Sequence, residues 1–178
     1  MNLINKHTLF PIDLFEFNRE LNNQELINKL YSLKQLNNQG VTSNSNGGWQ
    51  SERNFYTFPE LQILNNIIKD LIQDIFQSNC RILNMWGSIY SKGDFNNIHN
   101  HPSLQYTNNP LWSGVYYLKT FPNSGAFHVH SNNNITDKVT FYPKENDLFL
   151  FNSSTYHSVD PNTEDGDRIC IAFNLQLI

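Results

Sequence analysis

The sequence predicts a mainly-β protein with N-terminal helices, whose strands form an antiparallel sandwich of the jelly-roll kind. Two observations support this fold class. Apolar stripes at helical spacing occupy the first 80 residues. From residue 81 onward, about seven short strand-like runs are separated by turn signals. We therefore expect a single domain over residues 1–178, with a helical buttress at 1–80 and a jelly-roll core at 81–178.

Two helices are expected in the buttress. Residues 22–25 can cap a first helix, and residues 57–60 have the spacing of a capping box at the start of a second. Apolar positions follow each start at helical spacing: Leu26, Ile27, Leu30 and Leu33 in the first helix, and Leu61, Leu64, Ile68, Leu71 and Ile75 in the second. We expect both apolar faces to cover a sheet.

The strands of the core are expected at 81–90, 98–101, 113–120, 126–130, 139–142, 147–152 and 168–177. Turn signals at residues 92–94, 122–125 and 160–162 separate them, through glycine, proline and asparagine. Many short strands at this spacing are typical of a sandwich or barrel.

Composition excludes several classes of protein. With 39% hydrophobic and 13% aromatic residues the chain is expected to be globular. A net charge of −4 without a basic stripe argues against a nucleic-acid groove. No apolar run approaches a membrane span, and no signal-peptide pattern opens the chain. Two cysteines are too few for a disulfide framework, which favours a reducing cytoplasm.

Histidines are the most informative feature, because five of the six lie between residues 99 and 157. His99 and His101 are two residues apart, so on a strand both imidazoles point at one place. A third imidazole from His157, on a later strand, would cover one face of a metal ion and leave positions open for substrate. His128 and His130 form a second pair, which either lines the mouth of the barrel or has no role there.

A positively charged side chain, Arg168, follows the last of these histidines in the sequence. Arg168 lies far enough beyond His157 for the chain to turn and return on the adjacent strand. A guanidinium group can hold a carboxylate through two hydrogen bonds in a fixed geometry. The alternative is that Arg168 only pairs with a surface acid such as Asp165 or Asp167, in the weak kind of ion pair that is common on protein surfaces.

Together these motifs resemble iron(II)/2-oxoglutarate-dependent oxygenases of the prolyl-hydroxylase-like superfamily. The motifs that carry the resemblance are Tyr90, His99-x-His101, residues 113–118, Gly125, residues 143–144, residues 148–151, His157, and Arg168 with Asn174. Residues 9–11 and 45–51 resemble an uncharacterised group of such oxygenases from bacteria and phages. The resemblance implies a double-stranded β-helix, a cupin-like jelly roll. For a phage protein, the compartment would be the host cytoplasm.

The resemblance also implies a chemistry. Iron(II) would be bound by His99 and His157, 2-oxoglutarate would take two open positions, and dioxygen would take the third. Arg168 and Tyr117 would bind the far carboxylate of 2-oxoglutarate, and Tyr90 would face its metal end. Oxidative decarboxylation would then give succinate, carbon dioxide and a hydroxylated product of an unidentified primary substrate.

The chain departs from the superfamily pattern at one position, where His101 replaces an acid. Three interpretations remain open: His101 is the third ligand, it turns aside, or an acid such as Asp94 or Asp137 reaches the metal. We favour the first, because residues i and i+2 project together. Two other functions also remain: a cupin-like three-histidine enzyme that does not use 2-oxoglutarate, and a non-catalytic binding module on the same fold.

Overall fold

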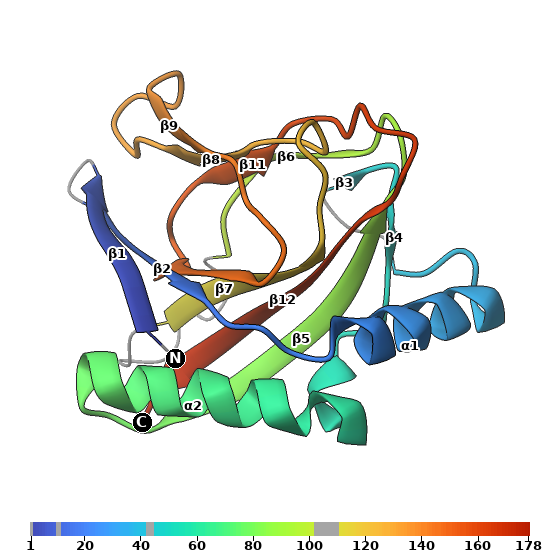
Figure 1. Ribbon diagram of the computed structural model, residues 1–178. Helices are drawn as coiled ribbons and strands as arrows, with labels where there is room; N and C mark the ends of the chain where they lie inside the picture. Colours follow the sequence, from blue (N-terminus) through green and yellow to red (C-terminus); the bar gives the residue numbers. More distant parts are fainter. Residues whose placement is uncertain (1, 10–11, 42–44, 102–110) are drawn as a thin grey trace.

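The computed structural model describes residues 2–9, 12–41, 45–101 and 111–178 (Figure 1). Phe10 and Pro11 of the N-terminal motif lie outside these residues. Within them the elements are β1 (Asn2–Leu9), β2 (Ile12–Asn18), α1 (Asn23–Leu36), β3 (Ser45–Asn46), β4 (Trp49–Gln50), α2 (Gln62–Phe76), β5 (Cys80–Tyr90), β6 (Phe95–His99), β7 (Leu111–Lys119), β8 (Phe127–His130), β9 (Lys138–Phe141), β10 (Asp147–Asn152), β11 (His157–Val159) and β12 (Arg168–Leu177). Two short 3-10 turns, Phe55–Thr57 and Pro59–Leu61, precede α2.

The described strands form two sheets. The larger has the order β1-β2-β10-β7-β12-β5-β4, and the smaller has the order β3-β6-β11-β8-β9. Neighbouring strands in both sheets run antiparallel. The smaller sheet faces one side of the larger, and the two helices cover the other side (Figure 1). The prediction of an antiparallel sandwich with N-terminal helices is therefore confirmed.

Both helices bury the apolar faces that their spacing predicts. Leu26, Ile27 and Leu30 of α1 join the same apolar cluster as Leu64 and Ile68 of α2. The α1 helix approaches β5 closely at Gly87, where an added Cβ would lie 2.0 Å from Leu30 Cδ2. A larger residue at this position would push the helix away from the sheet.

The N-terminal region differs from the expected helical buttress because it also contains strands, among them β3 and β4, and because its second helix starts differently. Its first residues form strands β1 and β2, and β2 extends the larger sheet by pairing with β10. The capping box at residues 57–60 does not form, because the Thr57 hydroxyl donates to the Asn54 carbonyl 2.8 Å away. The α2 helix then begins at Gln62, after the second 3-10 turn.

Alternation along the central strands separates the core from an internal cavity. On β12, Ile169, Ile171 and Phe173 join the apolar cluster under the helices. Arg168 and Asn174 point to the opposite face, where they line the cavity. No helix among the described residues has the length and apolar character needed to cross a membrane.

Candidate metal centre

A cavity of about 240 Å³ lies between the sheets, lined by residues of the larger sheet, by β3, β6, β8 and β11 of the smaller sheet, and by Arg53, Asn100 and His101 outside the strands. All six residues that the sequence analysis assigned to metal and cosubstrate line this cavity: His99, His101, His157, Arg168, Tyr117 and Tyr90. The structure therefore brings the predicted site residues to one place.

The three histidines converge from two neighbouring strands. His99 ends β6 and pairs in register with His157 of β11. His101 follows β6, and its backbone amide donates to the Ser153 carbonyl at 2.8 Å. The three potential ligand atoms, one from each ring, lie within 4.8 Å of one another. This spacing is suited to a single metal ion bound by three imidazoles.

Each of the three rings is held by a hydrogen bond at Nδ1. His99 donates to the Asn97 carbonyl at 2.7 Å, and His157 donates to the Thr155 carbonyl at 2.9 Å. His101 Nδ1 lies 2.8 Å from Asn174 Oδ1. Because these acceptors require a proton on Nδ1, the neutral rings carry their lone pairs on Nε2. Such bonds fix the tautomer and the orientation of a metal-binding histidine.

Burial keeps these rings neutral. It lowers the pKa of His99, lowers that of His101 to about 4, and lowers that of His157 well below its usual range. The neighbouring histidines lower the pKa of His101 and His157 further, and the charge of Arg53 acts on His101 in the same direction. A neutral imidazole is the form that binds a metal.

The two acids considered as alternative ligands are placed elsewhere. Asp94 Oδ2 accepts a hydrogen bond from the Ser91 amide at 2.8 Å, and Asp137 is an exposed residue just before β9. Neither residue belongs to the histidine group or lines the cavity within the described ranges. Of the three interpretations, the geometry favours His101 itself as the third ligand.

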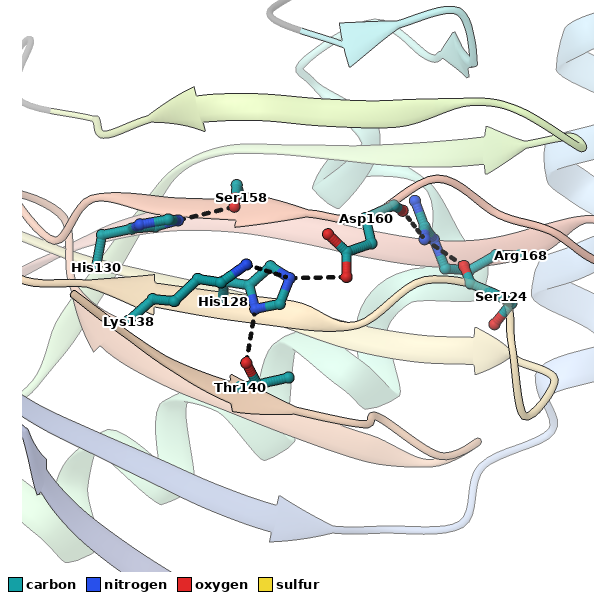
Figure 2. Close-up of polar contacts among 8 residues, drawn as sticks. All are labelled: Ser124, His128, His130, Lys138, Thr140, Ser158, Asp160 and Arg168. Atoms are coloured by element: carbon teal, nitrogen blue, oxygen red, sulfur yellow. Dashed lines mark hydrogen bonds and ion pairs between the residues drawn. The ribbon is translucent and has the colours of Figure 1, made fainter. Parts of the chain in front are cut away.

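Arg168 is buried in the same cavity, with 1% of its surface exposed. Its Nη1 donates to the Ser124 carbonyl and, at 3.3 Å, to the Asp160 carbonyl, as Figure 2 shows. Its Nη2 is buried without a hydrogen-bond partner among the described residues. A buried cation without an anionic partner is unfavourable. The alternative pairing with Asp165 or Asp167 is not made: Asp165 pairs with Lys92, and Asp167 accepts from Tyr31 and Ser91.

The two tyrosines lie at the arginine. Tyr117 is buried beside Cys170, and burial raises the pKa of its hydroxyl well above the usual range, so it remains a hydrogen-bond donor. The Tyr90 ring centroid is 4.5 Å from the Arg168 guanidinium carbon. The Tyr90 hydroxyl already donates to Asn96 at 3.0 Å. Tyr90 therefore packs against Arg168 and also lines the cavity, and its expected place at the metal end of the cosubstrate stays a prediction.

The second histidine pair belongs to β8, and neither His128 nor His130 is among the residues that line the cavity. Figure 2 shows its polar contacts. His128 contacts Asp160 Oδ2 at 2.8 Å through Nε2 and Thr140 Oγ1 at 2.9 Å through Nδ1. His130 contacts Ser158 Oγ at 2.8 Å and the Ile135 carbonyl at 2.7 Å. Because every ring nitrogen of the pair has a partner, these residues have no free lone pair for a metal.

Sequence reasoning assigned no role to three further residues of the cavity. Asn174 orients His101, and its amide nitrogen donates to Asn84 Oδ1 at 2.7 Å. The sequence could have indicated Asn174, because an even number of residues separates it from Arg168 and both therefore lie on one face of the strand. Trp86 and Arg53 also line the cavity. Arg53 belongs to a loop, where no periodicity predicts its direction.

Comparison with protein families identifies one match. The model of a family described as "Putative 2OG-Fe(II) oxygenase" matches residues 84–174, just over half of the chain. The matched segment contains the three histidines, both tyrosines and Arg168. No curated protein matches the chain at the level of sequence.

Several solved structures are similar in fold. HygX from Streptomyces hygroscopicus, solved with nickel, 2-oxoglutarate and hygromycin B, has a TM-score of 0.72 at 14% identity, covering 92% of this chain and 82% of its own. The viral collagen prolyl hydroxylase of Paramecium Bursaria Chlorella virus-1 gives 0.67 at 12%, covering 93% and 96%. A Pseudomonas putida prolyl-4-hydroxylase gives 0.64 at 13%, covering 92% and 91%. The expected double-stranded β-helix is thereby confirmed.

Proposed function

The chain belongs to the 2OG-Fe(II) oxygenase family, and from this premise we propose that His99, His101 and His157 bind iron(II) while Arg168 and Tyr117 bind 2-oxoglutarate. Iron(II), 2-oxoglutarate and dioxygen are the cofactor and cosubstrates of the family. The bound iron supplies the chemistry that couples decarboxylation of 2-oxoglutarate, to succinate and carbon dioxide, to oxidation of a primary substrate. We propose hydroxylation as that oxidation.

One observation supports this assignment above the others. Three imidazoles with free Nε2 atoms share a cavity with a buried arginine that has an unpartnered Nη2. The histidines offer a metal one face of nitrogen ligands. The arginine offers an anion a charged donor away from solvent, where such a hydrogen bond is strong. A dicarboxylate that also chelates the metal would satisfy both groups at once.

The three-histidine interpretation is supported by what surrounds His101. Its Nδ1 is shared between Asn174 Oδ1 at 2.8 Å and Ser113 Oγ at 3.1 Å, so the ring is fixed with Nε2 toward the other two histidines. A neutral third ligand leaves the iron more positive than an acid would. The fixed orientation of the rings partly compensates for the missing negative charge in iron affinity, because the rings lose little freedom when the metal binds.

The test is an anaerobic titration of the purified protein with iron(II) and then 2-oxoglutarate. We expect one iron per chain and a visible charge-transfer absorbance on adding 2-oxoglutarate. Admission of air should then yield succinate. His99→Ala and His157→Ala should bind no iron at stoichiometric concentration, because each removes a ligand. His7→Ala should behave as wild type, since this histidine pairs with Glu16 on the surface.

The outcomes separate the proposal from the two other functions. Iron binding without succinate from 2-oxoglutarate would favour the three-histidine enzyme that uses a different substrate. No iron binding in the wild type would favour a non-catalytic module. Full iron occupancy in both His99→Ala and His157→Ala would overturn the ligand assignment.

A further inference from the structure

A second arginine, Arg53, lines the cavity and lies at its exposed side. Its backbone is fixed to β5, because its carbonyl accepts a hydrogen bond from the Met85 amide at 2.8 Å and Asn54 forms a parallel bridge with Met85. The guanidinium carbon lies 5.2 Å from the centroid of the Trp86 ring. This cation–π contact holds the arginine against the aromatic ring.

Trp86 connects Arg53 to the metal centre. The Trp86 ring meets the His101 ring edge-on, with 5.9 Å between centroids. Arg53, Trp86 and His101 therefore form a continuous line from solvent to a proposed metal ligand. Among the described residues no carboxylate pairs with Arg53, so its charged N–H groups remain available to a ligand.

The charges of the cavity point to the chemistry of that ligand. None of the described residues that line it is an aspartate or a glutamate, and the sequence of residues 102–110 contains neither. The charges of iron(II) and the 2-oxoglutarate dianion cancel, and His101 contributes no negative charge where the superfamily has an acid. The positive charges of Arg53 and Arg168 therefore have no balancing anion from the protein.

We propose that Arg53 binds an anionic group of the primary substrate, a carboxylate or a phosphate, with Trp86 holding the guanidinium in place. This inference rests on the proposed function and adds the substrate class to it. A guanidinium presents paired N–H groups that match the oxygens of either anion. Its position beside Trp86 would hold the anionic end of the substrate near the cavity opening and leave the neutral part to extend toward the histidines.

The test uses nuclear magnetic resonance of the ¹⁵N-labelled protein, loaded with zinc(II) in place of iron(II). Saturating 2-oxoglutarate is added to occupy Arg168. Acetate and inorganic phosphate are titrated in separate arms, with acetamide as the neutral counterpart of acetate. The reporter is the indole N–H signal of Trp86, assigned by its loss in Trp86→Phe. The signals of Trp49 and Trp112 serve as internal references.

We expect a saturable shift of the Trp86 signal with at least one of the two anions and none with acetamide. The arm that saturates at lower concentration identifies carboxylate or phosphate as the preferred group. Arg53→Gln should weaken the anion affinity at least tenfold. Arg81→Gln should retain it, because this exposed arginine of β5 contacts Gln176 and lies outside the cavity.

Equal anion shifts in wild type and Arg53→Gln would overturn the inference, since the anion would then bind at the metal or elsewhere. The absence of any shift in a wild-type protein that binds zinc and 2-oxoglutarate would also overturn it, and would leave the proposed function intact. Failure to bind zinc or 2-oxoglutarate would instead refute the proposed function, and this inference with it.

Discussion

Replacing Arg168 with alanine measures what the buried guanidinium contributes to cosubstrate binding. Nη1 is already used by two backbone carbonyls, so Nη2 is the donor that remains for the far carboxylate of 2-oxoglutarate. A charged hydrogen bond contributes about 1.5–3 kcal/mol, and about 1.4 kcal/mol is tenfold in affinity. Arg168→Ala should therefore weaken 2-oxoglutarate binding by about ten- to a hundredfold. The 2-oxoglutarate affinity of Arg168→Lys should lie between those of wild type and Arg168→Ala, because lysine keeps the positive charge but lacks the planar guanidinium group.

The assay is an anaerobic titration of 2-oxoglutarate into the iron-loaded protein, followed by its charge-transfer absorbance. Iron affinity should be unchanged in Arg168→Ala, because the arginine is not a proposed ligand. Arg81→Ala is the matched control, since it removes an exposed arginine from the neighbouring strand. A thermal melt shows whether the variant still folds after Ser124 and Asp160 lose their donor. If the iron-loaded variant binds 2-oxoglutarate as tightly as wild type, the cosubstrate does not use Arg168.

Three further predictions follow from the same geometry. His101→Asp should keep at least wild-type iron affinity in a chelator competition, whereas His101→Ala should lose at least tenfold if the imidazole is a ligand. Gly125→Ala should weaken 2-oxoglutarate binding and spare iron binding, because Gly125 has φ of +105° and an added Cβ would lie 2.2 Å from Arg168 Nη1 and 2.3 Å from the Asp160 carbonyl oxygen; wild-type 2-oxoglutarate affinity would show that the arginine tolerates displacement. In the folded, metal-free protein the pKa of His101 is about 4, below its usual 6.5. As pH falls, His101 is therefore protonated in the unfolded chain at a higher pH than in the folded protein. The free energy of unfolding from urea melts should therefore decrease from pH 6.5 toward pH 4, and His101→Phe should decrease less over that range.

The sequence predicted those features that depend on local alternation. The direction of Arg168 follows from its place on an alternating strand. The spacing of two residues predicted that His99 and His101 converge, but the strand expected at 98–101 is β6, which ends at His99. His101 lies beyond that strand, and its hydrogen bonds to Ser153 and Asn174 fix its direction. The pairing of His157 with His99 is different, because the register between β11 and β6 is set by long-range contacts and by loops. The three-residue strand β11 is too short to show a periodicity of its own.

The N-terminal strands were missed for a related physical reason. Segment 12–18 alternates apolar and polar residues only in part, and its strand conformation depends on pairing with β10 of the core. Strand preference varies with such context more than helix preference does. Arg53 could not be predicted for another reason: its direction is fixed by the hydrogen bond of its carbonyl to Met85 and by its contact with Trp86.

The histidine in place of the acid links the metal centre to the substrate class. An acidic ligand would supply one negative charge to a cavity that contains Arg168 and Arg53. With His101 there instead, held by Asn174 and Ser113, the described protein groups around the cavity carry positive charge alone. Electrostatic attraction in a partly enclosed, low-dielectric cavity favours ligands of the opposite sign. His101→Asp therefore tests how the net charge of the cavity affects substrate binding. The variant should weaken the binding of the anion at Arg53 while it maintains iron binding. Unchanged anion affinity in that variant would mean that Arg53 acts independently of the charge at the metal.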